Sequence, residues 1–175
     1  IIKNKHFRLC NYREKIYVFY IIFFYGFAYE LLKFFIKLLQ LKFIECVPHG
    51  HGKLTSSDGE KYDGEFVYGH RKGHGKFTSS DGDEYDGEWK GNLNHGRGVY
   101  TNAFGTKYDG EFKYDNFHGK GKMTYAYGAK YDGEWKDGSY HGHGKLTEKN
   151  RDKYDGEWKD DKKNGHGKFC LLYTS

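Results

Sequence analysis

One tetrapeptide, Tyr-Asp-Gly-Glu, recurs at a constant step of 23 residues along most of this 175-residue chain. Each copy is followed by Phe or Trp, and a Gly-x-Gly element recurs with the same step between the copies. The tetrapeptides begin at Tyr62, Tyr85, Tyr108, Tyr131 and Tyr154, and the Gly-x-Gly elements begin at Gly50, Gly73, Gly96, Gly119, Gly142 and Gly165. No insertion interrupts this register, so the sequence predicts a tandem array of one small structural unit.

Each unit predicts two β-strands. Along the first tetrapeptide, strand alternation places Tyr62, Gly64 and Phe66 on one face and Asp63 and Glu65 on the other. The Gly-x-Gly element likewise places its two glycines on one face with the hydrophobic residue that follows two positions later. Because glycine weakens the interior of a strand, its regular recurrence predicts a steric role: it leaves space for the large rings on the same face.

A three-residue loop is predicted between the two strands of a unit. A two-residue turn would pair Leu54 with Asp63 and mix the two faces. A loop of residues 57–59, with its final glycine in the left-handed conformation, pairs Leu54 with Tyr62 instead. Glycine recurs at this position in the next three units, but Arg151 replaces it in the fifth, so we expect the last turn to differ.

The motif Tyr-x-Gly-x-Trp/Phe, followed by Asn/His-Gly-x-Gly at a 23-residue step, resembles the MORN repeat (membrane occupation and recognition nexus). The resemblance covers residues 49–169, and we place the array at 48–169. It implies an all-β fold, an elongated and twisted single-layer antiparallel sheet of tandem 23-residue hairpins. Six Gly-x-Gly strands and five tetrapeptide strands make eleven, which at ~4.8 Å per strand gives a length of roughly 50 Å.

The aromatic and glycine face of this sheet is the candidate partner-binding surface. We interpret its residues first as packing residues, but a single layer is not expected to bury so many rings without help. We therefore expect a helix of this chain, a partner helix or a second array to lie across the face. The motif residues on it are Tyr62, Gly64, Phe66, Tyr85, Gly87, Trp89, Tyr108, Gly110, Phe112, Tyr131, Gly133, Trp135, Tyr154, Gly156 and Trp158.

The opposite face carries alternating charges. Glutamate recurs in every tetrapeptide, and lysine recurs beside nearly every Gly-x-Gly element, which favours a solvated surface whose charges compensate one another. On this interpretation Glu88→Ala costs little stability, whereas Trp89→Ala costs much more. Residues 48–175 hold 21 basic and 21 acidic side chains, so the whole net charge of +5 lies in residues 1–47. The array therefore lacks the basic footprint of a nucleic-acid-binding protein.

No catalytic, cofactor or metal site is expected. His141 and His143 have an i, i+2 spacing, but Arg97 replaces a histidine at the position equivalent to His143, which favours a polar surface over a metal ligand. Leu54 follows Lys53 where a phosphate-binding loop needs Ser or Thr, and no helix is predicted there. No nucleophile with a partnering base stands out from the repeats. We expect the chain not to be an enzyme.

Residues 1–47 differ from the array, since 31 of the 47 are hydrophobic. Basic residues precede an uncharged run over 16–29, which is shorter than the ~18 residues that indicate a membrane-spanning helix. Polar residues then recur at helical spacing from Glu30 to Gln40, and a predicted helix ends before Pro48. Two interpretations stay open within the natural protein: residues 16–44 contact a membrane, or they form a helix that covers the aromatic face.

A third interpretation is that residues 1–47 are not native. The chain begins with Ile, and this segment is rich in residues with A/T-rich codons. The tail, residues 170–175, also leaves the repeat, with Cys170 where threonine recurs. We therefore expect the sequence to be a fragment. Cys10, Cys46 and Cys170 form no disulfide framework, which predicts a reducing, cytoplasmic environment.

These observations predict a non-catalytic scaffold that binds a protein or dimerises through the aromatic face, at a membrane or on the cytoskeleton. The family resemblance implies this too, because similar arrays occur in junctophilins, which link membranes to cytoskeletal structures. Two alternatives stay open. Similar repeats precede the catalytic domains of plant phosphatidylinositol-phosphate kinases and of a histone lysine methyltransferase, so the array could regulate a larger enzyme. The other alternative is an anionic-lipid-binding module, which the neutral charge of the array disfavours.

Overall fold

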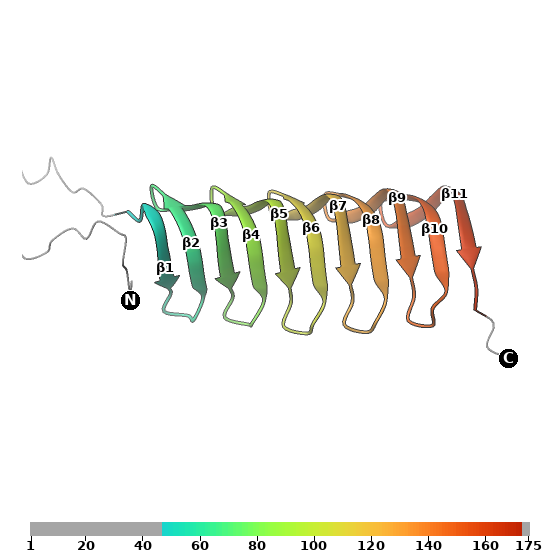
Figure 1. The fold of residues 1–175 in the computed structure, drawn as a ribbon, viewed down its shortest axis with the longest axis horizontal. Coiled ribbons are helices and arrows are strands. Elements are labelled where there is room, and N and C mark those ends of the chain that lie inside the picture. Colours follow the sequence, from blue (N-terminus) through green and yellow to red (C-terminus); the bar gives the residue numbers. More distant parts are fainter. Residues whose placement is uncertain (1–46, 173–175) are drawn as a thin grey trace, which may run out of the picture.

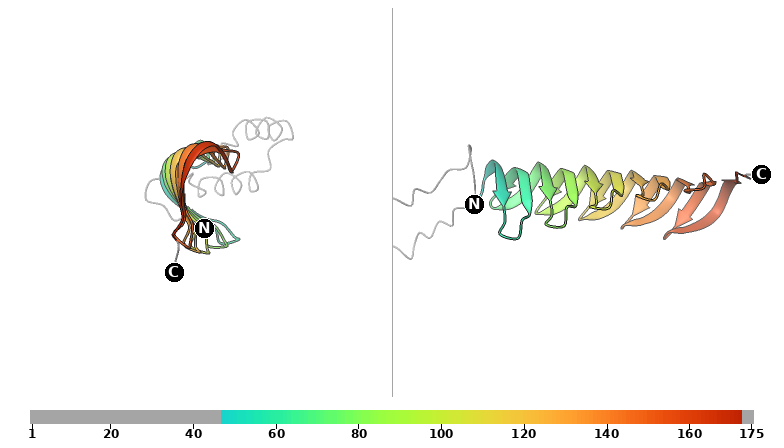
Figure 2. Two further views of the ribbon diagram at one scale, coloured as in Figure 1. Left: turned by 90° about the vertical axis from the view of Figure 1, so that its right-hand side faces the viewer. Right: turned by 90° about the horizontal axis from the view of Figure 1, so that it is seen from below.

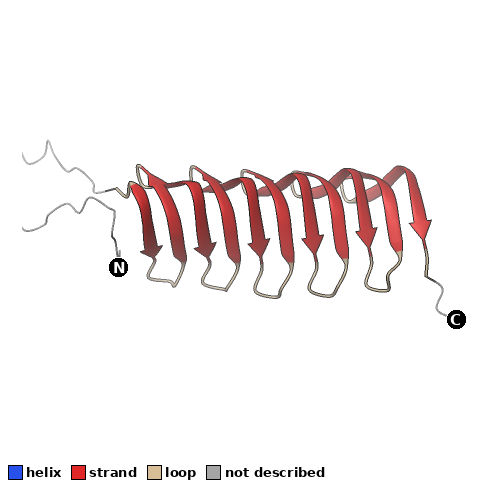
Figure 3. Cartoon of the chain, in the orientation of Figure 1, coloured by secondary structure: helices blue, strands red, loops and turns tan. Residues whose placement is uncertain are grey.

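The computed structural model describes residues 47–172, which form one open antiparallel sheet with its strands in sequence order (Figure 1). The strands are β1 (Gly50–Thr55), β2 (Lys61–Val67), β3 (His70–Thr78), β4 (Glu84–Lys90), β5 (Leu93–Thr101), β6 (Lys107–Lys113), β7 (Asn116–Thr124), β8 (Lys130–Lys136), β9 (Ser139–Thr147), β10 (Lys153–Lys159) and β11 (Lys162–Cys170). The predicted all-β, single-layer array of eleven strands is confirmed over these residues (Figure 3).

The two ends of the chain are only partly described. The helix predicted within residues 1–47 lies outside the described residues, apart from Val47, and so does the end of the tail, residues 173–175. Residues 47–172 contain no helix with the length and apolar character that a bilayer crossing requires. Cys170, which we assigned to the tail, is instead the last residue of β11 and pairs with Lys153 of β10.

The predicted three-residue loop and its register are confirmed. Leu54 pairs with Tyr62, so the hydrophobic residue and the motif tyrosine share one face of the sheet. The amide of Ser56 donates to the carbonyl of Glu60 at 3.0 Å and closes the loop. Gly59 has a φ of 97°, the left-handed conformation that the face argument requires.

The last of these loops was expected to differ, and this expectation is wrong. Arg151 adopts the same left-handed conformation as the glycines at its position, with a φ of 70°. The amide of Glu148 donates to the carbonyl of Asp152, and the amide of Arg151 donates to the carbonyl of Glu148, both at 2.9 Å. These backbone hydrogen bonds and the register of β9 and β10 hold the arginine in a conformation that its side chain disfavours.

Two-residue turns join each motif strand to the strand that follows. Both central residues have positive φ in all five turns, as type I′ turns require. These turns also bind one unit to the next, because the amide of Asn92 donates to the carbonyl of Arg71 at 3.1 Å and the amide of Asp115 donates to that of Asn94 at 3.0 Å. Successive turns therefore form a continuous hydrogen-bonded edge along the array.

A β-bulge bends each of the long odd-numbered strands from β3 onward. In β3 the register with β2 shifts between Gly64 and Phe66, and Gly73, which lies in the bulge, has a φ of 68°. A bulge bends its strand and increases the local twist. Viewed along the array, the strands are curved in cross-section (Figure 2). Beyond the bulge, Arg71 pairs with Phe66 and lies on the same face as the motif rings.

The motif glutamates stabilise the bulges. The Glu88 carboxylate accepts a hydrogen bond from the amide of Arg97 at 3.0 Å, and the Glu111 carboxylate accepts one from the amide of Lys120 at 3.1 Å. Each of these amides directly follows a bulge glycine. The glutamates are exposed, as predicted, but their contact with the bulge amides was not predicted.

Charge pairing on this outer face is carried instead by the aspartates of the motif. Lys53 lies 2.7 Å from Asp63, and Lys122 lies 3.0 Å from Asp132, between directly paired strand positions. The predicted compensation of charges between strands is thus confirmed with a different acidic partner. These pairs are exposed, and each is expected to contribute only ~0–1 kcal/mol.

Glycine makes room for the motif tyrosine, as predicted. Gly64 and Gly75 face each other across β2 and β3, and a Cβ atom on Gly64 would lie 2.5 Å from the Cα atom of Gly75. The same Cβ atom would lie 2.6 Å from the hydroxyl of Tyr62. That hydroxyl donates to the carbonyl of Glu65 at 3.1 Å. The equivalent glycine pair lies beside each of the other four motif tyrosines.

We predict that Arg151→Gly stabilises the array. The substitution removes ~1–2 kcal/mol of left-handed strain and adds ~0.5–1 kcal/mol of unfolded-chain entropy, so the free energy of unfolding should rise by up to ~1 kcal/mol. Gly105→Arg is the matched control, because its φ is 89° and no atom lies within 4 Å of a Cβ placed there. Chemical denaturation of both variants measures the effects, and the same sign in both would contradict the strain at Arg151.

A second prediction concerns Glu88 and Trp89. The Trp89 ring is 6% exposed and its indole N–H donates to the carbonyl of Gly75 at 2.8 Å, so Trp89→Ala should cost ~3–5 kcal/mol. Glu88→Ala should cost ~1 kcal/mol, because the amide of Arg97 loses its acceptor. Glu88→Gln keeps an acceptor oxygen and should recover most of that loss in thermal unfolding. If Glu88→Ala unfolds like the wild type, the carboxylate contributes nothing at the bulge.

Candidate interaction surface

The motif rings that we predicted to face a partner form the core of the sheet itself. Their exposed fractions lie between 0 and 6%, and Tyr108 and Tyr131 are completely buried. The expectation that a single layer cannot bury these rings without a covering element is wrong. The buried rings are those of Tyr62, Phe66, Tyr85, Trp89, Tyr108, Phe112, Tyr131, Trp135, Tyr154 and Trp158.

The rings bury one another in a ladder that runs through all the units. Within a unit, Tyr85 meets Trp89 edge-to-face with ring centroids 5.0 Å apart. Between units, Tyr85 meets Phe112 at 4.9 Å, and Tyr62 meets Trp89 at 5.4 Å. Edge-to-face pairs of this kind add ~0.5–1.5 kcal/mol to the burial of the rings. The ladder therefore couples each unit to the next.

A second set of residues covers the ladder, and the sequence analysis missed it. The member of each unit stands nine residues after the motif tyrosine, on the strand end that the bulge turns onto the aromatic face. We call these the cover residues: Arg71, Asn94, Phe117, Tyr140 and Lys163. They vary from unit to unit, so the repeat pattern gave no signal for them. The signal that could have found them is the glycine two residues later in each unit, because a glycine with positive φ inside a strand marks a bulge.

The accessible part of this face is a band of half-buried apolar side chains. They pack on the buried ladder from above and remain in contact with solvent. We call this band the inner stripe: Leu54, Phe77, Tyr100, Phe117, Tyr125, Tyr140 and Leu146. The residues that a partner would touch are thus the inner stripe and the cover residues, and the predicted motif residues support them from below.

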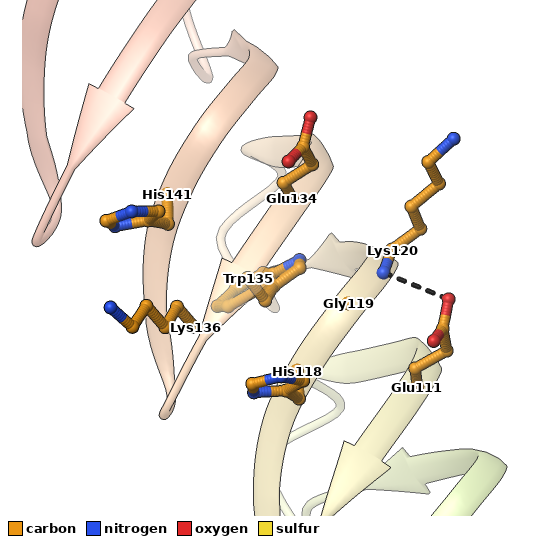
Figure 4. A pocket seen from close by; sticks show the side chains of 8 residues that line it. All are labelled: Glu111, His118, Gly119, Lys120, Glu134, Trp135, Lys136 and His141. Carbon is orange, nitrogen blue, oxygen red and sulfur yellow. Dashed lines mark hydrogen bonds between the residues drawn. The ribbon is translucent and has the colours of Figure 1, made fainter.

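The outer face carries a broad hollow of about 510 Å³ near the bulges of β7 and β9 (Figure 4). Charged side chains of both signs line it, among them Glu111, Lys120 and Lys136. His118 and His141 also line it, 3.6 and 3.7 Å from aspartates in the two-residue turns. In residues 47–172 no group of three or more His, Cys, Asp or Glu side chains is arranged to hold a metal ion.

Burial changes the acid–base behaviour of the tyrosines on the inner face. It raises the pKa of Tyr62 to about 12, against the attraction of the nearby Arg71 guanidinium. Burial and the Asp83 carboxylate, 2.6 Å from the hydroxyl, raise the pKa of Tyr100 to about 12. Burial raises the pKa of Tyr85 and Tyr131 further. All these groups are neutral at physiological pH.

These shifts predict alkaline unfolding. Tyrosines ionise near pH ~10 in the unfolded chain, while the buried ones stay neutral, so the folded state binds more protons. The tyrosine contribution to the free energy of unfolding should therefore be fully present below pH ~10 and be lost as the pH rises toward ~12. Phenolate absorbance and the β-sheet circular dichroism should change together in one cooperative transition. Tyrosine ionisation with intact circular dichroism would contradict the burial of these hydroxyls.

The model of the MORN repeat family matches six stretches of the chain: residues 47–61, 62–84, 85–103, 108–129, 131–152 and 154–170. No curated protein matches the chain as a relative. The six stretches follow the hairpins of the structure, since five of them begin within one or two residues of the start of a motif strand. They span the whole array and well over half of the chain. The chain therefore belongs to the MORN repeat family.

Proposed function

We propose that the array is a non-catalytic scaffold whose inner face binds a segment of a partner protein. The observation that carries this proposal is the inner stripe, in which seven half-buried apolar side chains follow one another along the array. Complete burial of one such side chain contributes ~1.5–3 kcal/mol, so a few of them support specific binding. Membership of the MORN repeat family also supports a scaffold that acts through its repeats, either in protein interaction or at a membrane.

The shape of the sheet favours a helix as the bound segment. The strands are curved in cross-section (Figure 2). Because the motif rings are buried without a second layer, we infer that they and the inner stripe lie on the inside of this curve. A convex helix with one apolar face fits such a surface. Two inner faces cannot nest in each other, because both are concave. The outer face carries cross-strand ion pairs and offers no comparable apolar band.

The proposal predicts a difference between two neighbouring residues of β9. Leu146 lies in the inner stripe, whereas Lys145 points to the outer face and lies 3.6 Å from Asp155. Leu146→Glu should abolish capture of the partner by the full chain from an extract of its own cells, and Lys145→Glu should leave capture unchanged. Circular dichroism establishes that both variants are folded. Equal capture by both variants would refute binding through the inner face.

A second candidate function rests on the loop edge of the array. Phe104 and Tyr127 stand at the tips of adjacent three-residue loops and are 85% and 58% exposed. Lys107 and Lys130 begin the strands that follow these loops. Exposed aromatic rings flanked by lysines are typical of segments that contact the membrane interface. This edge supports the alternative of an anionic-lipid-binding module.

Vesicle co-sedimentation of the full chain tests this candidate. Wild type should bind vesicles that contain anionic lipid, and Phe104→Ser with Tyr127→Ser should lose most of that binding. Tyr68→Ser with Tyr114→Ser is the matched control, because these exposed rings lie in turns at the opposite edge. Binding that both double variants retain would exclude the loop edge as the lipid contact.

A further inference from the structure

One unit of the array has no large side chain over its motif tyrosine, unlike the units next to it. In the third and fourth units the cover residue is aromatic: Phe117 stacks on Tyr108 with centroids 4.0 Å apart, and Tyr140 stacks on Tyr131 at 3.7 Å. In the second unit the cover residue is Asn94, which supplies no ring. In the first and fifth units a cation takes this place, with Arg71 5.4 Å from the centroid of the Tyr62 ring and Lys163 5.1 Å from that of Tyr154. The second unit has neither a ring nor a long cation over its motif tyrosine.

A cavity of about 270 Å³ occupies the inner face at Asn94. Aromatic residues, Phe77, Trp89 and Tyr100 among them, form much of its lining, and Asn94 and Arg71 line it from the cover positions. Its volume lies below the ~300–1,000 Å³ that sites for drug-sized ligands and cofactors usually have. It is large enough to hold a single aromatic side chain.

Arg71 gives the cavity a cationic wall. Its guanidinium carbon lies 4.6 Å from the ring centroid of Phe77 and 4.8 Å from that of Trp89. Burial lowers the pKa of this guanidinium, while the charges of Glu60 and Asp115 act in the opposite direction. In the part of the chain that the structure describes, no carboxylate forms an ion pair with it. The side-chain N–H groups are thus available to a carboxylate that enters the cavity.

Three carboxylates line the cavity, and each already has a partner. Glu84 pairs with Lys76 at 3.0 Å. Asp83 accepts hydrogen bonds from the Tyr100 hydroxyl at 2.6 Å and from the amide of Ala103 at 2.9 Å. Asp115 accepts one from the amide of Asn94 at 2.7 Å. These carboxylates bind groups of the array itself, whereas the N–H donors of the Arg71 side chain are available to a ligand in the cavity.

We propose that this cavity is a socket for one aromatic side chain of a partner polypeptide that carries a carboxylate next to the ring. The ring inserts between Phe77, Trp89 and Tyr100 and takes the place that Phe117 and Tyr140 fill in their own units. The carboxylate pairs with Arg71. This inference rests on the proposed partner binding and identifies the acidic and aromatic residues that a bound segment needs at the second unit.

The test uses the ¹⁵N-labelled full chain and three blocked peptides: acetyl-Glu-Phe-Glu-amide, acetyl-Gln-Phe-Gln-amide and acetyl-Glu-Ala-Glu-amide. The first should shift the NMR signals of the Trp89 indole and the Asn94 side-chain amide, and the other two should bind about tenfold more weakly or not at all. Equal binding of the three would overturn the proposal. So would phenylacetate binding as tightly as the first peptide, since that outcome indicates a small-molecule site.

Three variants locate the peptide. Asn94→Phe places a ring in the socket, and should raise thermal stability and abolish peptide binding. Arg71→Gln should weaken the acidic peptide to the level of the neutral one, whereas Lys163→Gln, at the equivalent cover position of the fifth unit, should change nothing. Unaltered binding to Asn94→Phe or to Arg71→Gln would overturn the socket. If Asn94→Phe does not fold, the comparison of Arg71→Gln with Lys163→Gln decides.

The socket and the proposed function fail in different ways. If Asn94→Phe captures the partner while Leu146→Glu does not, the inner face is the binding surface and the socket is refuted. If Leu146→Glu captures the partner while the acidic aromatic peptide binds the wild type and not Asn94→Phe, the socket stands and partner binding at the Leu146 end of the inner stripe is refuted.

Discussion

The motif tyrosine lies over a pair of glycines, and the rest of the array depends on this contact. A Cβ atom on Gly87 would lie 2.5 Å from the Cα atom of Gly98 and 2.7 Å from the hydroxyl of Tyr85, so neither the strand spacing nor the ring position tolerates a side chain there. The hydroxyl in turn donates to the carbonyl of Glu88 at 2.8 Å, one residue before the next motif ring. Two contacts therefore fix each tyrosine. The glycine pair packs against the face of the ring, and the hydroxyl at its tip is hydrogen-bonded. Only a ring held this way can meet the Phe or Trp of the following unit edge-to-face and continue the ladder.

A single sheet usually needs a second layer, and this array makes one from its own strands. The bulge at Gly73 and its equivalents turns the ends of the odd-numbered strands onto the aromatic face. The motif glutamates accept a hydrogen bond from the backbone amide that follows the bulge. The bulge thus accounts both for the burial of the aromatic ladder and for the curvature of the sheet. The consequence for function is a division of labour. On the inner face, the repeated residues build the buried frame, whereas the residues that vary, in the cover positions and the inner stripe, are the ones left in contact with solvent.

The sequence predicted the parts of the fold that follow from periodicity and parity. Eleven strands, the pairing of Leu54 with Tyr62 and the left-handed Gly59 all follow from the requirement that apolar side chains share one face. The bulge could not be predicted in this way, because two extra residues in β3 leave both the 23-residue step and the parity of the strand unchanged. Without the bulge, Arg71 would not pair with Phe66, and the Glu88 carboxylate would not accept a hydrogen bond from the amide of Arg97. At Arg151 the residue type was given too much weight. The register of β9 and β10 imposes a left-handed turn there, although arginine disfavours that conformation.

The same reasoning explains why the cover positions are suited to recognition. Five units hold Arg, Asn, Phe, Tyr and Lys in an equivalent place, yet the tyrosine in each unit is at most 4% exposed. The frame therefore accepts a cation, a short amide or a ring at this position without losing its core. Successive cover residues are two strands apart, about 9.6 Å at the usual strand spacing. The proposed partner helix, lying along the inner face, would meet one variable side chain per unit, and its own sequence would have to match them in that order. In a protein built from nearly identical units, the proposed binding would thereby gain a direction and a partner preference that the repeated motif alone cannot supply.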